Sequence, residues 1–336
     1  MKLHIHTFDL ELKETFRISH TSRDVQPTVV VELKEDGYSG FGEATATNYY
    51  GLTQEGMVAS LENLRPVIEN SKIESPEQWW KQIQPYLEGQ TFIQCALDVA
   101  AHDLFAKKMG KPLYQLWGLN LNKLPLSNYT IGIGSIEEMI RKMKAQPWPI
   151  YKIKLGTDKD IEIITALRQQ TDAIFRVDAN CAWTADQTIE YAPKLKALGV
   201  EFIEQPLPKE DFEGMKKVFQ QSVLPVIADE SCQTERDVKK CHQHFHGINI
   251  KLMKCGGLTP ARRMIKEAKA LGMKLMVGCM TESTIGISAI AQLLPLLDYV
   301  DMDGPLLIRN DIATGVIVID GKAHFPDENG TGAQLI

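Results

Sequence analysis

The sequence predicts an α/β protein with two domains: a closed barrel of parallel strands, and a smaller α+β domain that precedes it in the chain. Two observations predict this architecture. Beyond about residue 119, eight short apolar segments alternate with amphipathic helical stretches, as in barrels of parallel strands joined by helices. Before that point, β-rich segments come first and helical patterns follow them. With 336 residues, of which 44% are hydrophobic, the chain can bury a large core without disulfides.

The first domain is predicted to span residues 1–118 and to open with an antiparallel sheet. Its β-rich segments, the last two joined by a turn at 35–37, are residues 1–12, 28–33 and 38–44. Helical patterns follow at residues 53–69, 76–87 and 92–109. Ser75 and Pro76 are suited to begin the second helix, and Gly110 is suited to end the third.

The second domain is predicted to span residues 119–312 and to form a modified (β/α)7β TIM barrel. Its strands are expected at residues 127–133, 150–155, 174–178, 202–204, 226–229, 248–252, 274–277 and 299–302. The helices expected between them include residues 136–145, 160–170, 185–198, 235–242 and 260–271. The pattern after the eighth strand has hairpin signals instead of a helix, and residues 313–336 are expected to return to the first domain.

Composition and charge exclude several classes of partner. The formal charge is −6 and no basic stripe dominates any segment, so we expect no nucleic-acid partner. The apolar runs fall short of the roughly 20 residues that span a bilayer, so no membrane role is expected. A polar start without a signal peptide and six cysteines without a CxxC pair predict a cytoplasmic protein. The oligomeric state, including a homo-oligomer, stays open.

Charged residues end the predicted barrel strands, where apolar residues would be cheaper to bury. They are Lys152, Lys154, Asp178, Glu204, Asp229, Lys251, Asp301 and Asp303. A charged residue recurs about every 25 residues, once per strand-helix unit. The last interval, from Lys251 to Asp301, is twice as long and spans two units. Catalytic residues of such barrels lie at the carboxyl ends of the strands, so the spacing predicts one shared site. A single charge there is more often a structural ion pair, but a set in register favours catalysis.

Asp178, Glu204 and Asp229 are carboxylates on three successive predicted strands. At one rim they would repel one another unless a cation lay between them, and their hard oxygen ligands favour Mg²⁺ over zinc. Lys154 and Lys251 lie on strands to either side, so two amines can approach a substrate from opposite faces.

This arrangement indicates proton transfer at carbon. Removing a proton next to a carboxylate yields a doubly negative enediolate, which a divalent cation stabilises. A lysine acts as a base only when it is neutral, and positive charge from the metal and a second lysine depresses its pKa. If one lysine removes the proton and the other returns it on the opposite face, the centre is inverted. The residues therefore predict a racemase or an epimerase.

Short motifs around these positions are similar to those of a known family. They are Lys152-Ile153-Lys154, Asp178-Ala179-Asn180, Glu204-Gln205-Pro206, Asp229-Glu230-Ser231, and Asn249-Ile250-Lys251 before Gly256-Gly257. With them the chain resembles the muconate-lactonizing subgroup of the enolase superfamily, capping domain included, whose sites combine a lysine base with Mg²⁺. Asp301-Met302-Asp303 resembles the DxD motif of dipeptide epimerases of the L-Ala-D/L-Xaa type, such as Ala-Glu or Ala-Ala epimerases.

The resemblance implies a Mg-assisted 1,1-proton transfer that inverts the α-carbon of the C-terminal residue of an L-Ala-L-Xaa dipeptide. Asp178, Glu204 and Asp229 would bind one Mg²⁺ per subunit, and Lys154 and Lys251 would be the acid/base pair. The positions that would contact the dipeptide are Lys152 at its carboxylate, Asp301 and Asp303 at its ammonium group, and Thr130, Cys279 and Thr281 along it. Asn180 and Glu230 adjoin metal ligands and are expected to support them.

The resemblance leaves the C-terminal residue of the substrate open. Family members that act on Ala-Glu have an arginine in the first cap loop, and the alignment puts Thr21 there, with Arg23 two residues further on. Tyr49 and Tyr50 in the second cap loop form an aromatic wall that suits an apolar side chain. We therefore expect small or hydrophobic L-Ala-L-Xaa dipeptides, Ala-Ala included, with L-Ala-D/L-Glu epimerase as the alternative.

Three other functions compete. An o-succinylbenzoate synthase or a cycloisomerase would use the same metal and lysines, but neither substrate has an ammonium group for Asp301 and Asp303. A Schiff-base aldolase would need one lysine and no carboxylate triad. A non-catalytic binding protein would not need both lysines.

Overall fold

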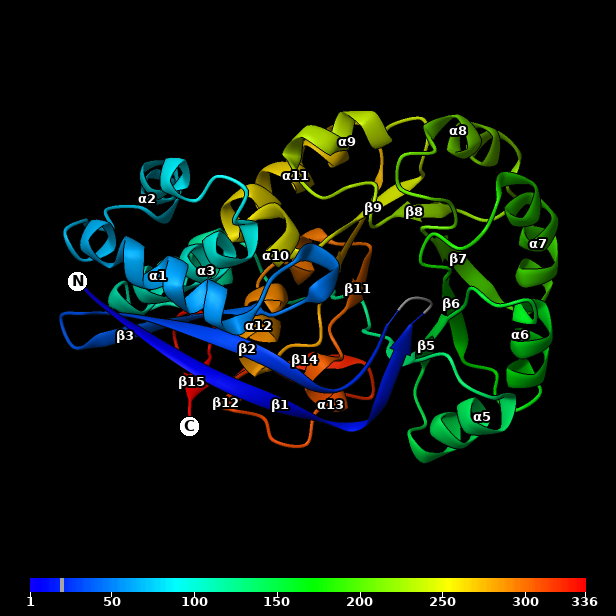
Figure 1. Cartoon of the computed structure of the whole chain (residues 1–336), viewed down its shortest axis with the longest axis horizontal. Helices are drawn as coiled ribbons and strands as arrows, with labels where there is room; N and C mark the ends of the chain where they lie inside the picture. The colour runs from blue at the N-terminus through cyan, green and yellow to red at the C-terminus, as the bar shows by residue number, and fades with distance from the viewer. Residues whose placement is uncertain (19–20) are drawn as a thin grey trace.

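The computed structural model describes residues 1–18 and 21–336, and the side chains of residues 18 and 21 lie outside the described set (Figure 1). A capping domain of antiparallel strands and helices packs beside a nearly closed barrel of eight parallel strands, which confirms the predicted fold class. Among the described residues, no helix is long and apolar enough to cross a membrane.

The capping domain is built on an antiparallel sheet in the order β1 (Lys2–Ile18), β2 (Thr21–Glu35) and β3 (Tyr38–Thr45). Its helices are α1 (Gln54–Glu69), α2 (Pro76–Ile83) and α3 (Thr91–Lys108). The predicted turn between β2 and β3 is present, with positive φ at Asp36 (53°) and Gly37 (83°). Helix α3 lies so close to β3 that a Cβ at Gly42 would be 2.0 Å from the carbonyl oxygen of Ala96. Only glycine permits this approach of helix to sheet.

Two predicted boundaries in this domain are wrong. After an irregularity between Glu11 and Phe16, the ladder of β1 and β2 continues to the pair of Ile18 and Thr21. Residues 16–18 and 21–23 of the expected first cap loop therefore belong to two strands, and its residues 19–20 lie outside the described residues. Alternation of apolar and polar residues is short here, at Phe16-Arg17-Ile18, and cross-strand contacts such as the hydrogen bond from Thr15 Oγ1 to Asp24 Oδ1 at 2.5 Å accompany the pairing. Helix α2 ends at Ile83 and a 3-10 turn follows at Gln84–Tyr86, because Pro85 has no backbone N–H to continue the α-helical hydrogen bonds.

The barrel strands follow the sequence order, and each overlaps one predicted strand. They are β4 (Tyr129–Ile131), β5 (Ile150–Lys154), β6 (Ile174–Asp178), β7 (Val200–Glu204), β8 (Val226–Ala228), β9 (Gly247–Ile250), β10 (Lys274–Gly278) and β11 (Tyr299–Asp301). A parallel bridge between Ser127 and Val300 brings the chain before β4 to β11, so the first and last strands meet. All strand ends therefore surround one mouth.

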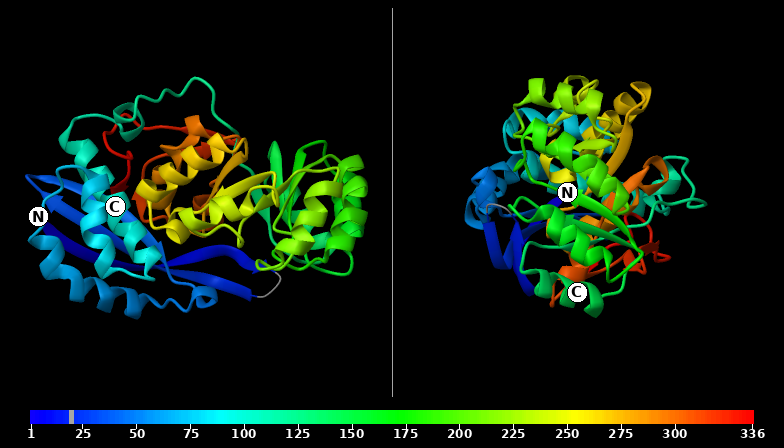
Figure 2. Two further views of the ribbon diagram at one scale, coloured as in Figure 1. Left: turned by 90° about the horizontal axis from the view of Figure 1, so that it is seen from above. Right: turned by 90° about the vertical axis from the view of Figure 1, so that its right-hand side faces the viewer.

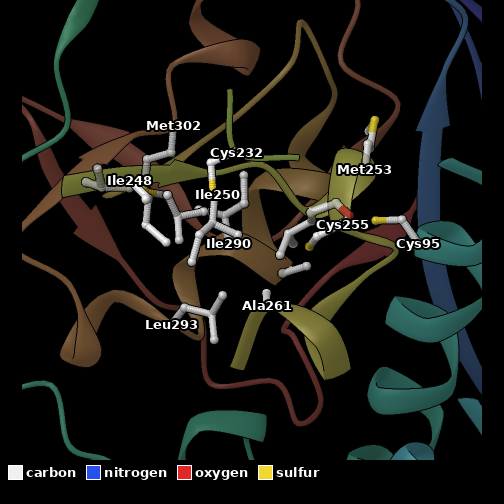
Figure 3. Packing of buried hydrophobic residues seen from close by; sticks show 14 of the residues in the cluster. Cys95, Cys232, Ile248, Ile250, Met253, Cys255, Ala261, Ile290, Leu293 and Met302 are labelled. Atoms are coloured by element: carbon white, nitrogen blue, oxygen red, sulfur yellow. Dashed lines mark hydrogen bonds between the residues drawn. The ribbon is translucent and has the colours of Figure 1, made fainter. Parts of the chain in front are cut away.

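Helices surround the strands, as the two views in Figure 2 show. They are α5 (Ile136–Ala145), α6 (Asp160–Arg168), α7 (Ala185–Ala197), α8 (Phe212–Gln221), α9 (Glu235–Cys241), α11 (Leu258–Ala270) and α12 (Thr284–Ala291), with the short helices α4 (Leu113–Leu116), α10 (Leu252–Cys255) and α13 (Gly304–Leu307). In Figure 3, Ile248 and Ile250 of β9 lie among buried side chains such as Ile290 of α12, part of the core shared by strands and helices.

Residues 313–336 contain the expected hairpin and contact the capping domain. The hairpin strands are β13 (Ile317–Ile319) and β14 (Lys322–His324), flanked by β12 (Ala313–Thr314) and β15 (Gln334–Leu335). The backbone N–H of Thr331 donates to Asp103 Oδ1 at 2.7 Å, and Lys107 Nζ donates to the carbonyl oxygen of Ala333 at 3.0 Å. Both partners lie on α3, so this segment joins the sheet-covering helix of the cap.

The long β1–β2 hairpin carries the cap to the barrel mouth. In Figures 1 and 2 it runs beneath the barrel towards β5. The carbonyl oxygen of Arg17 on β1 accepts a hydrogen bond from the backbone N–H of Ile133 at 3.0 Å, just beyond β4. Gly132 permits this contact, since a Cβ there would lie 3.0 Å from the same oxygen. Cap residues near the end of the hairpin are thereby fixed beside the strand ends.

Candidate active site

Three carboxylates meet at the mouth of the barrel. Asp178 and Glu204 end β6 and β7 and are paired in register, and Asp229 directly follows β8. All three are buried, and each offers an oxygen within 4.8 Å of those of the other two. Glu204 Oε2 is buried without a hydrogen-bond partner, although Lys152 Nζ lies 2.8 Å away. Three buried carboxylates whose oxygens lie this close together fit a hard divalent cation.

The predicted lysines lie on either side of these carboxylates. Lys154, at the end of β5, places Nζ 2.6 Å from Asp178 Oδ2. Lys251, directly after β9, places Nζ 2.8 Å from Asp229 Oδ2. In the order of the sheet, the three carboxylate-bearing strands lie between β5 and β9. The two amines therefore flank the carboxylate triad from opposite sides.

The expected depression of the lysine pKa rests on the charge of a bound cation, and the protein groups by themselves shift the pKa of Lys251 in the opposite direction. Burial disfavours the ammonium form of Lys251, but the charge of Asp229 outweighs burial and holds the Lys251 pKa above its usual value. For Lys152, burial is outweighed by Glu204, Asp301 and Asp178, and its pKa is also raised. The carboxylates are thus neutralised by lysines wherever no cation binds them.

Two further carboxylates lie across the mouth. Asp301 ends β11 and accepts hydrogen bonds from Lys152 Nζ at 3.0 Å and from Asn128 Nδ2 at 2.8 Å. Asp303 accepts the backbone N–H of Thr130 at 2.5 Å. Burial, and then the charge of Asp301, raises the pKa of Asp303 to about 7. A cationic group placed between the two aspartates would favour their charged forms.

The capping domain closes the site above these residues. A cavity of about 130 Å³ is lined by the lysines, Asp229, Asp301, Asp303, Thr130, Cys279 and Thr281 of the barrel and by Phe16, Arg23, Tyr49 and Tyr50 of the cap. Arg23 donates from Nη2 to Thr281 Oγ1 at 3.0 Å, and its buried Nε has no hydrogen-bond partner. The rings of Tyr49 and Tyr50 pack edge to face, with their centroids 4.9 Å apart. Thr21 begins β2, and its side chain lies outside the described residues.

The two residues expected to support the ligands lie beside them. The backbone N–H of Asn180 donates to Asp178 Oδ1 at 3.0 Å, and its side chain contacts Glu230 Oε1 at 3.3 Å. Burial, with the charge of Asp229, raises the pKa of Glu230 to about 7. The structure thus brings together all predicted site residues whose side chains it describes.

Sequence reasoning missed two residues that shape the site. Lys254, on α10, is buried and places Nζ 2.5 Å from Asp229 Oδ1 and 2.6 Å from the Asp229 carbonyl oxygen. Its spacing of three residues from Lys251 is a signal that could have found it. Glu43, on β3, accepts hydrogen bonds from the backbone N–H groups of Ser283 and Gly286 at 3.1 and 3.3 Å. It ties the cap to the start of α12, directly after the cavity-lining segment 279–281.

Lys254→Met is expected to lower the free energy of unfolding by about 3 kcal/mol without added metal, because it leaves a buried carboxylate with one cation fewer. Added Mg²⁺ should then raise the melting temperature of the variant more than that of the wild type, because the ion replaces the lost charge. Thermal unfolding with and without Mg²⁺ measures both. Lys240→Met is the control, since the Lys240 and Asp237 pair is exposed. An equal Mg²⁺ shift in both proteins would contradict this role of Lys254.

Two family descriptions match the chain. "Mandelate racemase / muconate lactonizing enzyme, N-terminal domain" matches residues 3–118, and "Enolase C-terminal domain-like" matches residues 135–336. The chain belongs to the enolase superfamily. In this superfamily member, the first match covers the cap strands and helices, and the second covers barrel strands β5 to β11 with the site lysines and with Asp178, Glu204, Asp229, Asp301 and Asp303.

Similar proteins narrow the class within the enolase superfamily. An L-Ala-D/L-amino acid epimerase of Flavobacterium johnsoniae is 56% identical over 336 residues, covering 100% of both chains. An L-Ala-D/L-Glu epimerase of Bacteroides thetaiotaomicron is 41% identical, covering 100% of this chain and 88% of the relative. A dipeptide epimerase of Cytophaga hutchinsonii, solved with Mg and D-Ala-L-Val, superposes with a TM-score of 0.93 at 26% identity, over 99% of this chain and 95% of the other. The chain is an isomerase of the racemase and epimerase class.

Proposed function

We propose that this enolase-superfamily chain is a dipeptide epimerase, which inverts the α-carbon of the C-terminal residue of L-Ala-L-Xaa dipeptides by 1,1-proton transfer. One observation carries the proposal: Lys154 and Lys251 flank the carboxylate triad from β5 and β9. Two bases on opposite sides of one carbon are what inversion requires, because the proton must leave one face and return to the other. The three similar proteins support the same reaction class.

The chain's own residues then have distinct tasks. Lys154 and Lys251 exchange the α-proton, each on its own face. Lys152 donates to the substrate carboxylate, and Asp301 and Asp303 accept hydrogen bonds from the substrate ammonium. Asp178, Glu204 and Asp229 hold one Mg²⁺ per subunit, which supplies positive charge that favours neutral lysines and stabilises negative charge on the substrate. The cap residues that line the cavity exclude water from the reacting carbon; they are Phe16, Arg23, Thr45, Thr47, Tyr49 and Tyr50.

We propose a preference for small or hydrophobic C-terminal residues. Tyr49 and Tyr50 offer the C-terminal side chain an aromatic wall. A specific observation also supports the second candidate, L-Ala-D/L-Glu epimerase: Arg23 faces the cavity, and its buried Nε has no partner. A substrate carboxylate would satisfy that donor.

The six cysteines are free, which supports the proposed cytoplasmic location.

The decisive experiment is deuterium uptake in D₂O with Mg²⁺ across a library of L,L-dipeptides, followed by ¹H NMR. We expect the α-proton of the C-terminal residue to exchange in L-Ala-L-Ala and other L-Ala-L-Xaa dipeptides, with accumulation of the L,D product. Exchange in no member of the library would end the dipeptide proposal. Borohydride trapping of substrate, with activity indifferent to EDTA, would favour an aldolase instead.

Arg23→Met is expected to lower kcat/KM for L-Ala-L-Glu by about 10- to 100-fold, because a charge-assisted hydrogen bond is lost. The value for L-Ala-L-Val should change by less than about threefold, since its side chain offers no acceptor. Arg17→Met, on the opposite strand of the hairpin and exposed, is the matched control. If both dipeptides lose activity equally, Arg23 supports the fold of the site rather than its choice of substrate.

A further inference from the structure

A second cavity adjoins the substrate cavity on the side of β4. It has a volume of about 200 Å³, and it is lined by residues 12–16 of β1, by Tyr129 and Gly132, by Lys142, Ala145 and Gln146 of helix α5, and by Thr130 and Leu307. Phe16, Thr130 and Leu307 line both cavities. The proposed reaction uses none of the space beyond these three residues.

The three shared residues form a partition, and the backbone fixes them. Phe16 precedes Arg17, whose carbonyl oxygen accepts the N–H of Ile133 at 3.0 Å. Leu307 ends α13, the short helix that begins directly after Asp303 and turns back through a hydrogen bond from the Leu306 N–H to the Asp303 carbonyl oxygen at 2.9 Å. Thr130 donates its N–H to the Asp303 carboxylate. The partition is therefore attached to the same aspartate that the proposed function assigns to the substrate ammonium.

This attachment decides which part of a dipeptide faces the partition. The side chain of the N-terminal residue branches from the carbon that bears the ammonium group, so it lies beside whatever surrounds Asp303. Around Asp303 the cavity wall consists of Thr130, Leu307 and Cys279, whose Sγ is 3.9 Å from Asp303 Oδ1. The C-terminal side chain instead starts at the carbon between the two lysines. The partition thus faces the N-terminal side chain.

We propose that Phe16 and Leu307 separate the side chain of the N-terminal residue from the second cavity and so confine that residue to the size of alanine. When either partition residue is shortened, the second cavity becomes a subsite for a longer N-terminal side chain. This inference rests on the proposed function. The two partition side chains are apolar, and Lys142 on the far wall points its Nζ to Glu14 Oε2 at 3.5 Å, a carboxylate that Arg141 also contacts at 2.8 and 2.9 Å. An unbranched apolar side chain, such as that of methionine, fits the opening made by shortening either partition residue.

The test compares L-Met-L-Ala with L-Ala-L-Ala in the deuterium-exchange assay, using the full chain with Mg²⁺. Leu307→Ala and Phe16→Ala should each raise the ratio of kcat/KM for L-Met-L-Ala over L-Ala-L-Ala by roughly 10-fold or more, as expected for room for added methylene groups. Leu306→Ala is the matched control: it removes the same atoms from the same helix, but Leu306 lines neither cavity. Adding Ala145→Trp, which fills only the second cavity, to Leu307→Ala should cancel the gain.

The outcomes separate the two proposals. If the wild type exchanges no dipeptide, the proposed function fails and the subsite fails with it. If the wild type exchanges L-Ala-L-Ala, but neither partition variant shifts the ratio beyond the Leu306→Ala control, only the subsite is wrong. A gain that survives Ala145→Trp would also overturn it, because the extra room would then lie elsewhere. If thermal unfolding shows that one partition variant is not folded, the other partition variant decides the result.

Discussion

Replacement of Lys154 or Lys251 by methionine is expected to lower the rate of epimerisation by about 10²- to 10⁴-fold, the usual contribution of a positioned acid or base. Each variant keeps one lysine of the acid/base pair, and that lysine still reaches one face of the α-carbon. We therefore expect each variant to retain deuterium exchange, without inversion, in one epimer of the dipeptide. The epimer that exchanges deuterium in one variant should be the epimer that does not exchange in the other.

Exchange followed by ¹H NMR from both the L,L and the L,D dipeptide measures this directly. Lys196→Met, an exposed lysine on a barrel helix, is the control and should behave as the wild type. Loss of exchange from both epimers in both variants, with dipeptide binding intact, would contradict the placement of the amines on opposite faces.

Glu204→Gln is expected to lower kcat/KM by at least about 1,000-fold and to weaken Mg²⁺ binding, because it removes a charged oxygen from the triad. Glu204 is the sharpest choice, since it ends β7, between the strands that carry the other two carboxylates of the triad. Treatment of the wild type with EDTA should have a comparable effect, reversed by Mg²⁺.

Glu230→Gln is the matched control for this prediction. Glu230 is also a buried carboxylate at the mouth with one unpartnered oxygen, but it does not belong to the carboxylate triad. Replacement of a residue that only supports a metal ligand should lower Mg²⁺ affinity or kcat/KM by about 10- to 100-fold. Isothermal titration with Mg²⁺ and steady-state kinetics on L-Ala-L-Ala would compare the two. An equal loss in both variants would place the ion away from Glu204.

Much of the barrel was predictable because its signals are local. Each strand is a short apolar run, and the charge that ends it recurs once per unit, so Asp178 and Glu204 could be placed at one mouth before any coordinates were known. Helix α12 carries no such signal: it is buried on all sides, so its sequence has no polar face to set the period. No helix is therefore predicted there from the sequence.

Other parts of the site depend on contacts between distant residues, which one sequence does not encode locally. Glu43 reads as one more polar residue of an alternating strand, and only the packed structure brings it to Ser283, which is 240 residues away. The first cap loop was likewise read from family alignment, whereas backbone pairing extends the strands to Ile18 and Thr21, and Arg23 reaches Thr281 from β2. Lys254 was within reach of the sequence through its spacing from Lys251.

The attachment of residues 331–333 to helix α3 has a consequence for the order of folding during synthesis. Asp103 and Lys107 are buried in the cap, and partners of both leave the ribosome more than 220 residues later. While the barrel is being translated, these hydrogen bonds to residues 331–333 are missing from the nascent cap. The N-terminal domain is therefore completed only after the domain that follows it in the chain, the reverse of simple vectorial assembly.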